Sequence, residues 1–399
     1  MIESQIDQFH SLEQRYREIY GKPSSRWIFA PGRINLIGEH IDYCGGWVLP
    51  ATIQMGTYCL ASAGDSNGVR LASTLYDQRI ELDLDRPLEK SSADWPNYPV
   101  GVLSAYRNEG AQLSGMDVLF GSTIPGGGLS SSASFCVATA LLLECVTGFK
   151  LHHQDDINRK RIARLCQRVE NDFVGVNCGI MDQAAIALGQ ADKAIKLDCQ
   201  SLRYDLVDCV TEPMQFVIMN TCKVRTLIDS KYNERVREME TIVSRLDDRR
   251  DVSDLCELQP EDLDRIETAV GNGLLFRRAF HVISENQRVS EACRMLEEKN
   301  WMRLGELMNE SHRSLSQDYE VAGKELDTIV SLSQEQPGVL GARMTGAGFG
   351  GCAISLIHED AVEEYIGRVG ESYRQRIGYG AEFYPVQIGP GALDCTAFK

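Results

Sequence analysis

The order of hydrophobic and polar positions along the chain predicts helices and strands whose proportions change near the middle. Apolar residues recur at helical spacing over residues 1–20 and 156–171, and residues 130–147 are apolar almost all round, which is typical of a buried helix. Short apolar runs predict strands in the first half, at 27–30, 34–37, 57–62, 69–73 and 118–120. Long charged helices follow at 231–247, 285–298, 300–317 and 323–335, with strands at 352–357 and 382–388. The pattern therefore predicts two α+β domains that meet near residues 200–215.

Composition and charge exclude several classes of protein. The chain has 399 residues, of which 43% are hydrophobic, so it can build a substantial core. Its 57 acidic and 41 basic side chains give a net charge of −16, which disfavours a broad nucleic-acid or membrane surface. Any phosphate must therefore be held locally, by backbone donors, a few cations or a metal. There is no signal-peptide pattern, no apolar run of membrane-span length and no C-x-x-C pair among the 13 cysteines, so we expect a cytoplasmic protein with reduced thiols.

Two glycine-rich segments are candidate ligand loops. In residues 125–133 three glycines precede three serines and the buried helix, and a helix N-terminus behind a glycine turn attracts phosphate. Because the lysine of a Walker A loop is missing, the segment is either a phosphate loop of another kind or a turn with a serine N-cap. Residues 345–351 contain G-x-G-x-x-G but precede a strand, which excludes a dinucleotide-binding turn and leaves close backbone packing or ligand contact.

Polar side chains also gather among apolar residues in two other places. Residues 33–43 end a predicted strand and bring a glutamate, a histidine and an aspartate within four positions, a density of donors and acceptors that suits a polyol. A solvated loop is the alternative there. Glu170 and Asp182 are carboxylates in apolar surroundings, and Asp182 falls in the first turn of a predicted helix, where a favourable contact with the helix dipole is the structural alternative to a functional role.

These segments, in this order, resemble the GHMP kinases and, within that family, the galactokinases. The similar stretches are GRINLIGEHIDYCGGWVLP (32–50), PGGGLSSSAS (125–134), CGIMDQ (178–183), SKYNER (230–235), MNESHRSL (308–315) and RMTGAGFGG (343–351). The resemblance implies a two-domain α+β GHMP kinase fold, with an N-terminal domain at residues 1–205, a C-terminal domain at 206–399 and the active site in the cleft between them. It implies transfer of the γ-phosphoryl group of MgATP to the anomeric 1-hydroxyl of galactose, with ATP and Mg²⁺ bound by the chain.

The resemblance also implies roles for individual residues. The catalytic positions are matched by Asp182 and Arg33. The sugar-contacting positions are matched by Glu39, His40, Asp42, Gly179, Tyr232 and again Asp182. On the nucleotide side, the adenine positions are matched by Trp95 and Tyr98, and the phosphate loop by Gly126, Gly127, Gly128, Leu129, Ser130, Ser131 and Ser132. The magnesium positions are matched by Ser132 and Glu170.

Departures from the family pattern keep alternatives open. Ile41 and Cys44 stand where the galactokinase signature usually has Thr and Asn, while CGIMDQ favours galactose over its N-acetyl derivative. The alternatives are a kinase for N-acetylgalactosamine or an arabinose, or a non-catalytic sensor of galactose and ATP, although the serines of residues 130–134 are intact. Asp182 either accepts the hydroxyl proton or only orients the nucleophile. We expect a monomer without nucleic-acid or membrane partners.

Overall fold

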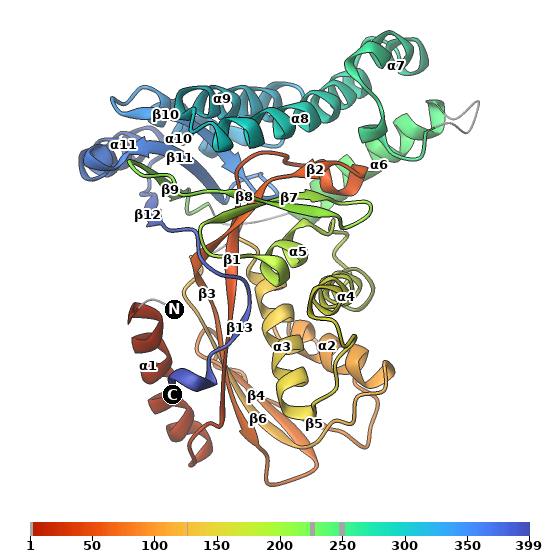
Figure 1. Cartoon of the computed structure of the whole chain (residues 1–399), viewed down its shortest axis with the longest axis vertical. Coiled ribbons are helices and arrows are strands. Elements are labelled where there is room, and N and C mark those ends of the chain that lie inside the picture. The colour runs from red at the N-terminus through yellow and green to blue at the C-terminus, as the bar shows by residue number, and fades with distance from the viewer. Residues whose placement is uncertain (1–2, 126, 224–227, 247–251) are drawn as a thin grey trace.

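The computed structural model describes residues 3–125, 127–223, 228–246 and 252–399. Within this part, nine strands form one sheet and four strands form another, and the two sheets lie one above the other along the long axis of the molecule (Figure 1). The helices are α1 (Glu3–Tyr20), α2 (Asn97–Asn108), α3 (Ser131–Thr147), α4 (Asp155–Arg168), α5 (Met181–Leu188), α6 (Ile228–Leu246), α7 (Leu263–Val270), α8 (Leu274–Glu297), α9 (Trp301–Gln317), α10 (Gly323–Gln334) and α11 (Val362–Ile377).

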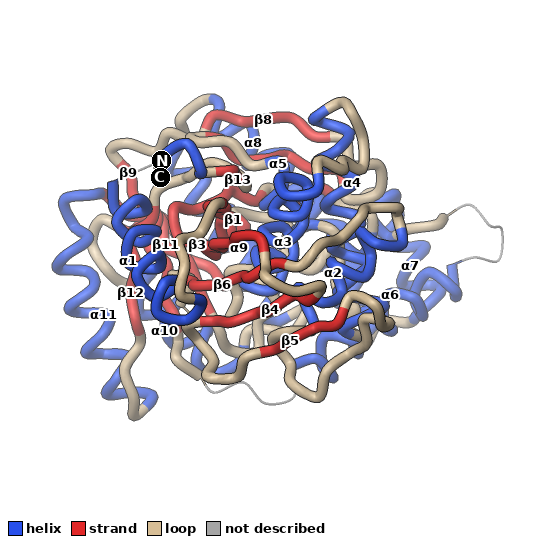
Figure 2. Tube along the Cα trace, turned by 90° about the horizontal axis from the view of Figure 1, so that it is seen from below, coloured by secondary structure: helices blue, strands red, loops and turns tan. Residues whose placement is uncertain are grey.

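The larger sheet is built around two long central strands. Its members are β1 (Arg26–Asn35), β2 (Trp47–Val48), β3 (Pro50–Ala63), β4 (Gly68–Ser73), β5 (Ile80–Asp83), β6 (Met116–Ser122), β7 (Lys193–Asp198), β8 (Tyr204–Asp208) and β13 (Leu393–Asp394). They follow the order β13-β1-β3-β6-β4-β5, and β7 pairs with β2, β3 and β8. Figure 2 shows α1 on one face of this sheet and α3 on the other. The helix α3 is buried over most of its length, as its apolar sequence predicts.

One strand differs from expectation in a way that builds the site. The sequence predicts separate strands at 27–30 and 34–37, whereas β1 is continuous, with a register shift against β3 between Pro31 and Arg33. Proline has no N–H to donate to a ladder, so an irregularity there is expected. A Cβ on Gly32 would lie 2.8 Å from the Leu129 carbonyl oxygen, so the absent side chain lets β1 approach the glycine–serine loop. Arg33 consequently begins the next stretch of strand beside that loop.

The smaller sheet carries the second half of the chain. It consists of β9 (Met214–Asn220), β10 (Val339–Thr345), β11 (Cys352–His358) and β12 (Glu382–Val386), in the order β10-β11-β9-β12. The helices α9 and α10 pack against β10. The chain passes between the sheets after β8 ends at Asp208, and β13 returns to pair with β1, so the two termini lie close together (Figure 1). A division at residues 205 and 206 stays a prediction, since β8 and β13 both pair within the larger sheet.

The helices of the second half confirm the predicted positions at 300–317 and 323–335 closely. The helix predicted at 285–298 is part of a longer one, α8, which already begins at Leu274. Among the described helices, none combines the length and the apolar composition that a membrane span requires.

Candidate active site

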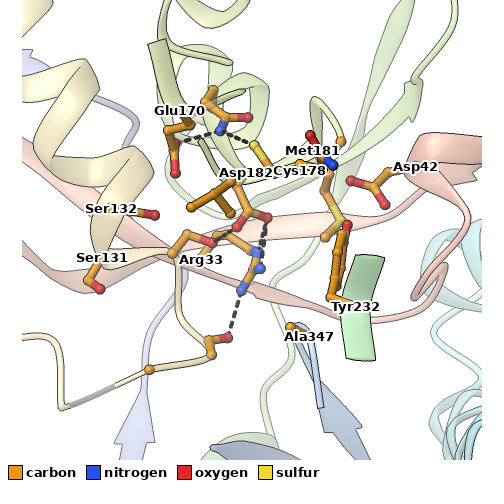
Figure 3. Close-up of a pocket in the computed structure, with 18 of the residues that line it drawn as sticks. Arg33, Asp42, Ser131, Ser132, Glu170, Cys178, Met181, Asp182, Tyr232 and Ala347 are labelled. Atoms are coloured by element: carbon orange, nitrogen blue, oxygen red, sulfur yellow. Dashed lines mark hydrogen bonds and ion pairs between the residues drawn. The ribbon is translucent and has the colours of Figure 1, made fainter. Parts of the chain in front are cut away.

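A cavity of about 320 Å³ opens where the loops of the two halves of the molecule meet (Figure 3). Its walls come from five segments, which are residues 33–42, 127–132, 170–183, 232–233 and 346–347, together with Tyr98. Four of them belong to the motifs that the sequence singles out, and Figure 3 shows their side chains pointing toward one another. Segments far apart in the chain therefore supply a single concave, polar site, which is the usual form of a small-molecule binding site.

Arg33 and Asp182 form an ion pair at the centre of this cavity. Arg33 Nη2 lies 2.7 Å and Arg33 Nε 2.9 Å from Asp182 Oδ1, and the Arg33 side chain is 4% exposed. Asp182 stands in the first turn of α5, as predicted, and its Oδ2 accepts a 2.5 Å hydrogen bond from Ser130 Oγ. Burial alone would lower the pKa of Arg33, but the charges of Asp182 and Glu39 raise it. The guanidinium thus stays cationic in a nearly closed environment.

The glycine–serine loop lies against the same ion pair. Arg33 Nη1 donates to the Gly128 carbonyl at 2.8 Å, and the backbone has positive φ at Gly128 (103°) and Ser130 (62°). Ser131 and Ser132 begin α3 and line the cavity, so the first-turn N–H groups of that helix, which have no acceptor within it, lie at the cavity wall. Such groups attract phosphate oxygens.

Leu129 differs in position from the other described members of the predicted phosphate loop. Gly127 and Gly128 line the cavity with the serines, whereas Leu129 is fully buried and its carbonyl accepts a hydrogen bond from the Arg33 N–H. Gly126 lies outside the described residues.

The second glycine loop packs directly against the first. A Cβ on Gly346 would lie 2.7 Å from the Gly128 carbonyl oxygen, so only glycine allows this approach. Gly346 and Ala347 also line the cavity. Close backbone packing, one of the two interpretations left open by the sequence, therefore applies at Gly346, and ligand contact stays a prediction for this loop.

The predicted sugar-contacting residues all line the cavity, and Figure 3 shows Asp42 and Tyr232 across the Arg33–Asp182 pair from Ser131 and Ser132. A Cβ on Gly179 would lie 1.9 Å from Asp42 Oδ2, so any larger residue there would displace that carboxylate. Burial raises the pKa of Asp42 to about 7, helped by the nearby charges of Asp182 and Glu39. Tyr232 projects into the cavity from α6 (Figure 3). This wall combines carboxylates, a phenol and an imidazole, which suits the recognition of hydroxyl groups.

His40 is held in one protonation state by its neighbours. Its Nε2 lies 3.2 Å from the Ala347 carbonyl and its Nδ1 lies 2.9 Å from the Tyr43 hydroxyl. Because a carbonyl only accepts, Nε2 carries the proton and Nδ1 accepts from Tyr43, whose oxygen in turn lies 2.8 Å from the Tyr319 hydroxyl. Burial lowers the pKa of His40 to about 3, so the ring is neutral at physiological pH.

Glu170 and Ser132 provide oxygen atoms on the phosphate side of the cavity. Glu170 is 3% exposed and lies in a π-helical turn, Val169–Val174, that follows α4. Burial raises its pKa to about 7, against the lowering effect of hydrogen bonds from Gln183 and Ser132. Gln183 Nε2 donates to Glu170 Oε1 at 2.6 Å, while Gln183 Oε1 is buried without a partner among the described residues. A buried carboxylate beside a hydroxyl and an unpaired amide oxygen is the kind of donor set that Mg²⁺ prefers.

The two predicted adenine-side aromatics lie in different surroundings. Tyr98, in the first turn of α2, lines the cavity. Trp95 does not; it is 6% exposed, its ring is parallel to that of Tyr76 at 5.8 Å, and it meets Phe135 edge-on at 6.4 Å. Its Nε1 is buried without a partner among the described residues. An adenine contact at Trp95 therefore stays a prediction.

Sequence reasoning did not single out several residues that shape the site. Gln183 and Asn233 line the cavity and lie within the quoted segments CGIMDQ and SKYNER, so a signal for them was present. Arg343 lies in RMTGAGFGG, is completely buried and donates from Nη2 to Glu39 Oε2 at 3.0 Å. Glu285 had no local signal, because it lies in a helix that reads as charged and solvent-facing.

Comparisons with known proteins show the family of this chain. The galactokinase galactose-binding signature matches residues 14–63, the GHMP kinases N-terminal domain 97–190 and the GHMP kinases C-terminal domain 290–375. Galactokinase from Enterococcus faecalis is 45% identical over 96% of this chain and 98% of its own length. Galactokinase from Clostridium perfringens is 44% identical over 97% of this chain and 100% of its own length.

Solved structures extend the comparison to three dimensions. Lactococcus lactis galactokinase complexed with galactose superimposes with a TM-score of 0.91 at 41% identity, covering 96% of this chain and 99% of that one. Mevalonate kinase from Methanococcus jannaschii has a TM-score of 0.65 at 18% identity and shares the fold alone. The expected GHMP kinase fold is thus confirmed. From its sequence, its fold and its match to curated relatives over nearly their whole length, the chain belongs to the galactokinase family of the GHMP kinases.

Proposed function

We propose that the chain transfers the γ-phosphoryl group of ATP to the anomeric 1-hydroxyl of galactose, giving galactose 1-phosphate and ADP. The observation that carries this proposal is the placement of the Arg33–Asp182 pair between a triple-serine helix terminus and a wall of hydroxyl-binding side chains. Phosphoryl transfer asks the protein mainly for positioning and charge stabilisation. Membership of the galactokinase family supports galactose as the sugar and ATP as the donor.

On the nucleotide side, backbone groups and one cation hold the phosphates. The N–H groups at the start of α3 and the hydroxyls of Ser131 and Ser132 donate to phosphate oxygens, with the positive end of the helix dipole behind them. Arg33, fixed by Asp182 and by the Gly128 carbonyl, places its charge where negative charge spreads over the oxygens of the transferring group. Because these donors are already oriented before the substrates bind, little reorganisation is needed during the reaction.

On the sugar side, Asp182 accepts a hydrogen bond from the 1-hydroxyl. Asp182 Oδ1 is paired with Arg33, so Oδ2 is the oxygen available to the sugar. Without sugar, Oδ2 accepts a hydrogen bond from the Ser130 hydroxyl, which can rotate away. Glu39, Asp42 and Tyr232 form hydrogen bonds with the remaining hydroxyls of the sugar. The Ala347 carbonyl accepts a hydrogen bond from His40 and so fixes the orientation of its neutral ring. Asp182 both aligns the attacking oxygen and takes up its proton as the bond to phosphorus forms.

Glu170 and Ser132 would hold Mg²⁺ beside the phosphates, and the unpaired Gln183 Oε1 is a further oxygen that fits this ion. When bound, the ion neutralises charge on the phosphate oxygens. The described residues contain no cluster of three or more His, Cys, Asp or Glu side chains suited to a metal, so the substrate phosphates and water would complete the coordination.

We also propose that the chain acts as a monomer in the cytoplasm, without nucleic-acid or membrane partners. ATP is a cytoplasmic substrate, and none of the thirteen cysteines, all of which lie in the described part of the chain, forms a disulfide. Light scattering coupled to size-exclusion chromatography tests the oligomeric state: a single species of about 44.5 kDa supports it and a dimer contradicts it.

The decisive experiment for the reaction is an ADP-release assay with a panel of sugars. We expect galactose to give the highest kcat/KM among galactose, N-acetylgalactosamine, glucose, arabinose and fucose. A higher kcat/KM with N-acetylgalactosamine or arabinose would replace the proposed substrate. ATP and galactose binding by calorimetry, without ADP release, would instead identify a sensor.

A further inference from the structure

The backbone of the sugar-contacting loop leaves the sheet in an unusual conformation. Gly38 has φ of 100° and His40 has φ of 62°, and the Gly38 and Glu39 N–H groups bond to a side chain on α8 rather than to a neighbouring strand. A Cβ on Gly38 would lie 2.9 Å from the Trp47 carbonyl oxygen and 3.0 Å from Val289 Cγ2 on α8, which shows how closely the helix approaches. A loop that is bent in this way needs acceptors from elsewhere in the chain.

Glu285 on α8 supplies those acceptors from 247 positions away in the sequence. Its Oε1 accepts from the Gly38 N–H at 3.0 Å, from the Glu39 N–H at 3.2 Å and from Ser311 Oγ at 2.7 Å. His281, one turn earlier on the same helix, lies with Nε2 3.1 Å from the Glu39 carbonyl and therefore donates to it. The helix thus holds Glu39 by both of its backbone groups.

The side chain of Glu39 is held by the same network. Arg343 Nη2 donates to Glu39 Oε2 at 3.0 Å, its Nη1 donates to the Asn35 carbonyl at 2.6 Å, and its Nε donates to Ser311 Oγ at 3.2 Å. The Ser311 hydroxyl therefore accepts from Arg343 and donates to Glu285. This single hydroxyl joins the group that fixes the Glu39 carboxylate to the group that fixes its backbone.

The charges in this buried network are balanced. Glu285 and Arg343 are fully buried, and Glu39 is 2% exposed. Arg288 closes the far end, with Nε 2.7 Å from Glu285 Oε2. Burial by itself would raise the pKa of Glu285, but Arg288, His281, Arg343 and the Ser311 hydrogen bond lower it, so the carboxylate is charged. Two carboxylates therefore face two guanidinium groups, and removing one of these charges leaves a buried charge without a full counter-charge.

We propose that Glu285 is a positioning residue for sugar recognition, acting through the backbone of Gly38 and Glu39 and through the Ser311–Arg343 link to present the Glu39 carboxylate to galactose. This inference rests on the proposed function, because it assumes that Glu39 contacts the sugar. It concerns the sugar half of the site: within the described residues, the hydrogen bonds of Glu285, Ser311 and Arg343 reach the loop that carries Glu39 and do not reach Ser131 or Ser132.

The test compares Glu285→Gln with Glu291→Gln. Glutamine at 285 keeps an oxygen for the two N–H groups, but its amide NH₂ faces the Arg288 donor. The change also removes the Glu285 charge, so the Glu39 carboxylate is the remaining ion-pair partner of Arg343 among the described residues. Glu291 lies on the same helix but pairs with Arg303 at 2.8 Å, away from the loop, so it receives the same chemical change without touching the network. We expect Glu285→Gln to raise the KM for galactose about tenfold or more and to leave the KM for ATP within about twofold.

Galactose binding measured by calorimetry without ATP should weaken by the same factor, and Glu291→Gln should match the wild type in both assays. Ser311→Ala removes the link but no charge, so it tests the network if Glu285→Gln does not fold, and we expect a smaller rise confined to galactose. Unchanged galactose affinity in a folded variant, or equal changes in both KM values, would overturn the inference. Failure of the proposed function would appear separately, as a wild-type chain that releases no ADP with galactose.

Discussion

Replacement of Arg33 by lysine separates the geometry of the guanidinium from its charge. Arg33 contacts Asp182 through Nε and Nη2 and the Gly128 carbonyl through Nη1, so one planar group joins the nucleophile-orienting carboxylate to the phosphate loop. A lysine ammonium is a point charge that cannot span both partners at once. Arg33→Lys therefore keeps the positive charge and loses at least one hydrogen bond to a charged or buried acceptor.

The size of the effect follows from those contacts. A hydrogen bond to a charged group contributes about 1.5–3 kcal/mol, so Arg33→Lys should reduce kcat/KM by roughly 10- to 150-fold. Arg33→Ala should cost more, on the order of 3–5 kcal/mol, because it leaves Asp182 partly buried without its partner. Steady-state ADP release at saturating ATP gives both values, and Arg15→Lys, at an exposed pair with Glu18, is the matched control. An Arg33→Lys variant within about twofold of wild type would refute the assigned geometry.

Three further changes probe the pH response and the nucleotide side. Burial raises the pKa of Asp42 to about 7, so the folded chain holds this proton more tightly than the unfolded chain and the stabilisation is lost as pH rises from about 4 to about 7. Asp42→Asn should therefore gain stability relative to wild type as the pH rises from about 4 to about 7 and keep that gain at higher pH, and a difference in melting temperature that does not change over this range would contradict this. Trp95→Ala should raise the KM for ATP more than the KM for galactose. Because the ring is buried, the change should also lower the free energy of unfolding by roughly 3–5 kcal/mol. An unchanged KM for ATP would show that Trp95 is not part of the nucleotide site. Glu170→Gln should raise the Mg²⁺ concentration needed for half-maximal activity about tenfold or more, whereas an unaltered Mg²⁺ titration would place the ion elsewhere.

The parts of the site that the sequence predicts are those whose chemistry is local. Three glycines before three serines and an apolar helix predict a loop at a helix N-terminus, and Ser131 and Ser132 line the cavity there. The Asp182 position in the first turn of a helix follows from the glycine that precedes it and the apolar residues after it. Short-range backbone preferences suffice in these cases.

The contacts that assemble the site could not be read from the same patterns. Arg33 meets Asp182 across 149 positions, and nothing in either segment alone specifies that pairing. The helix containing Glu285 has the charge pattern of a solvated surface, yet Glu285 and Arg278 are completely buried. Periodicity separates polar from apolar positions but cannot distinguish a charge that faces water from one that is neutralised by distant partners. The sequence likewise predicts two strands on either side of residues 31–33, whereas β1 continues through them with a register shift between Pro31 and Arg33.

The most direct test of the account is turnover in Asp182→Asn, measured beside galactose binding by calorimetry in the same preparation. Asparagine keeps the shape of the side chain but cannot take up the hydroxyl proton, so we predict that galactose still binds while kcat falls by a factor on the order of 100 or more. Turnover near the wild-type value, with galactose bound, would show that phosphoryl transfer does not depend on the Asp182 carboxylate and would contradict the proposed mechanism.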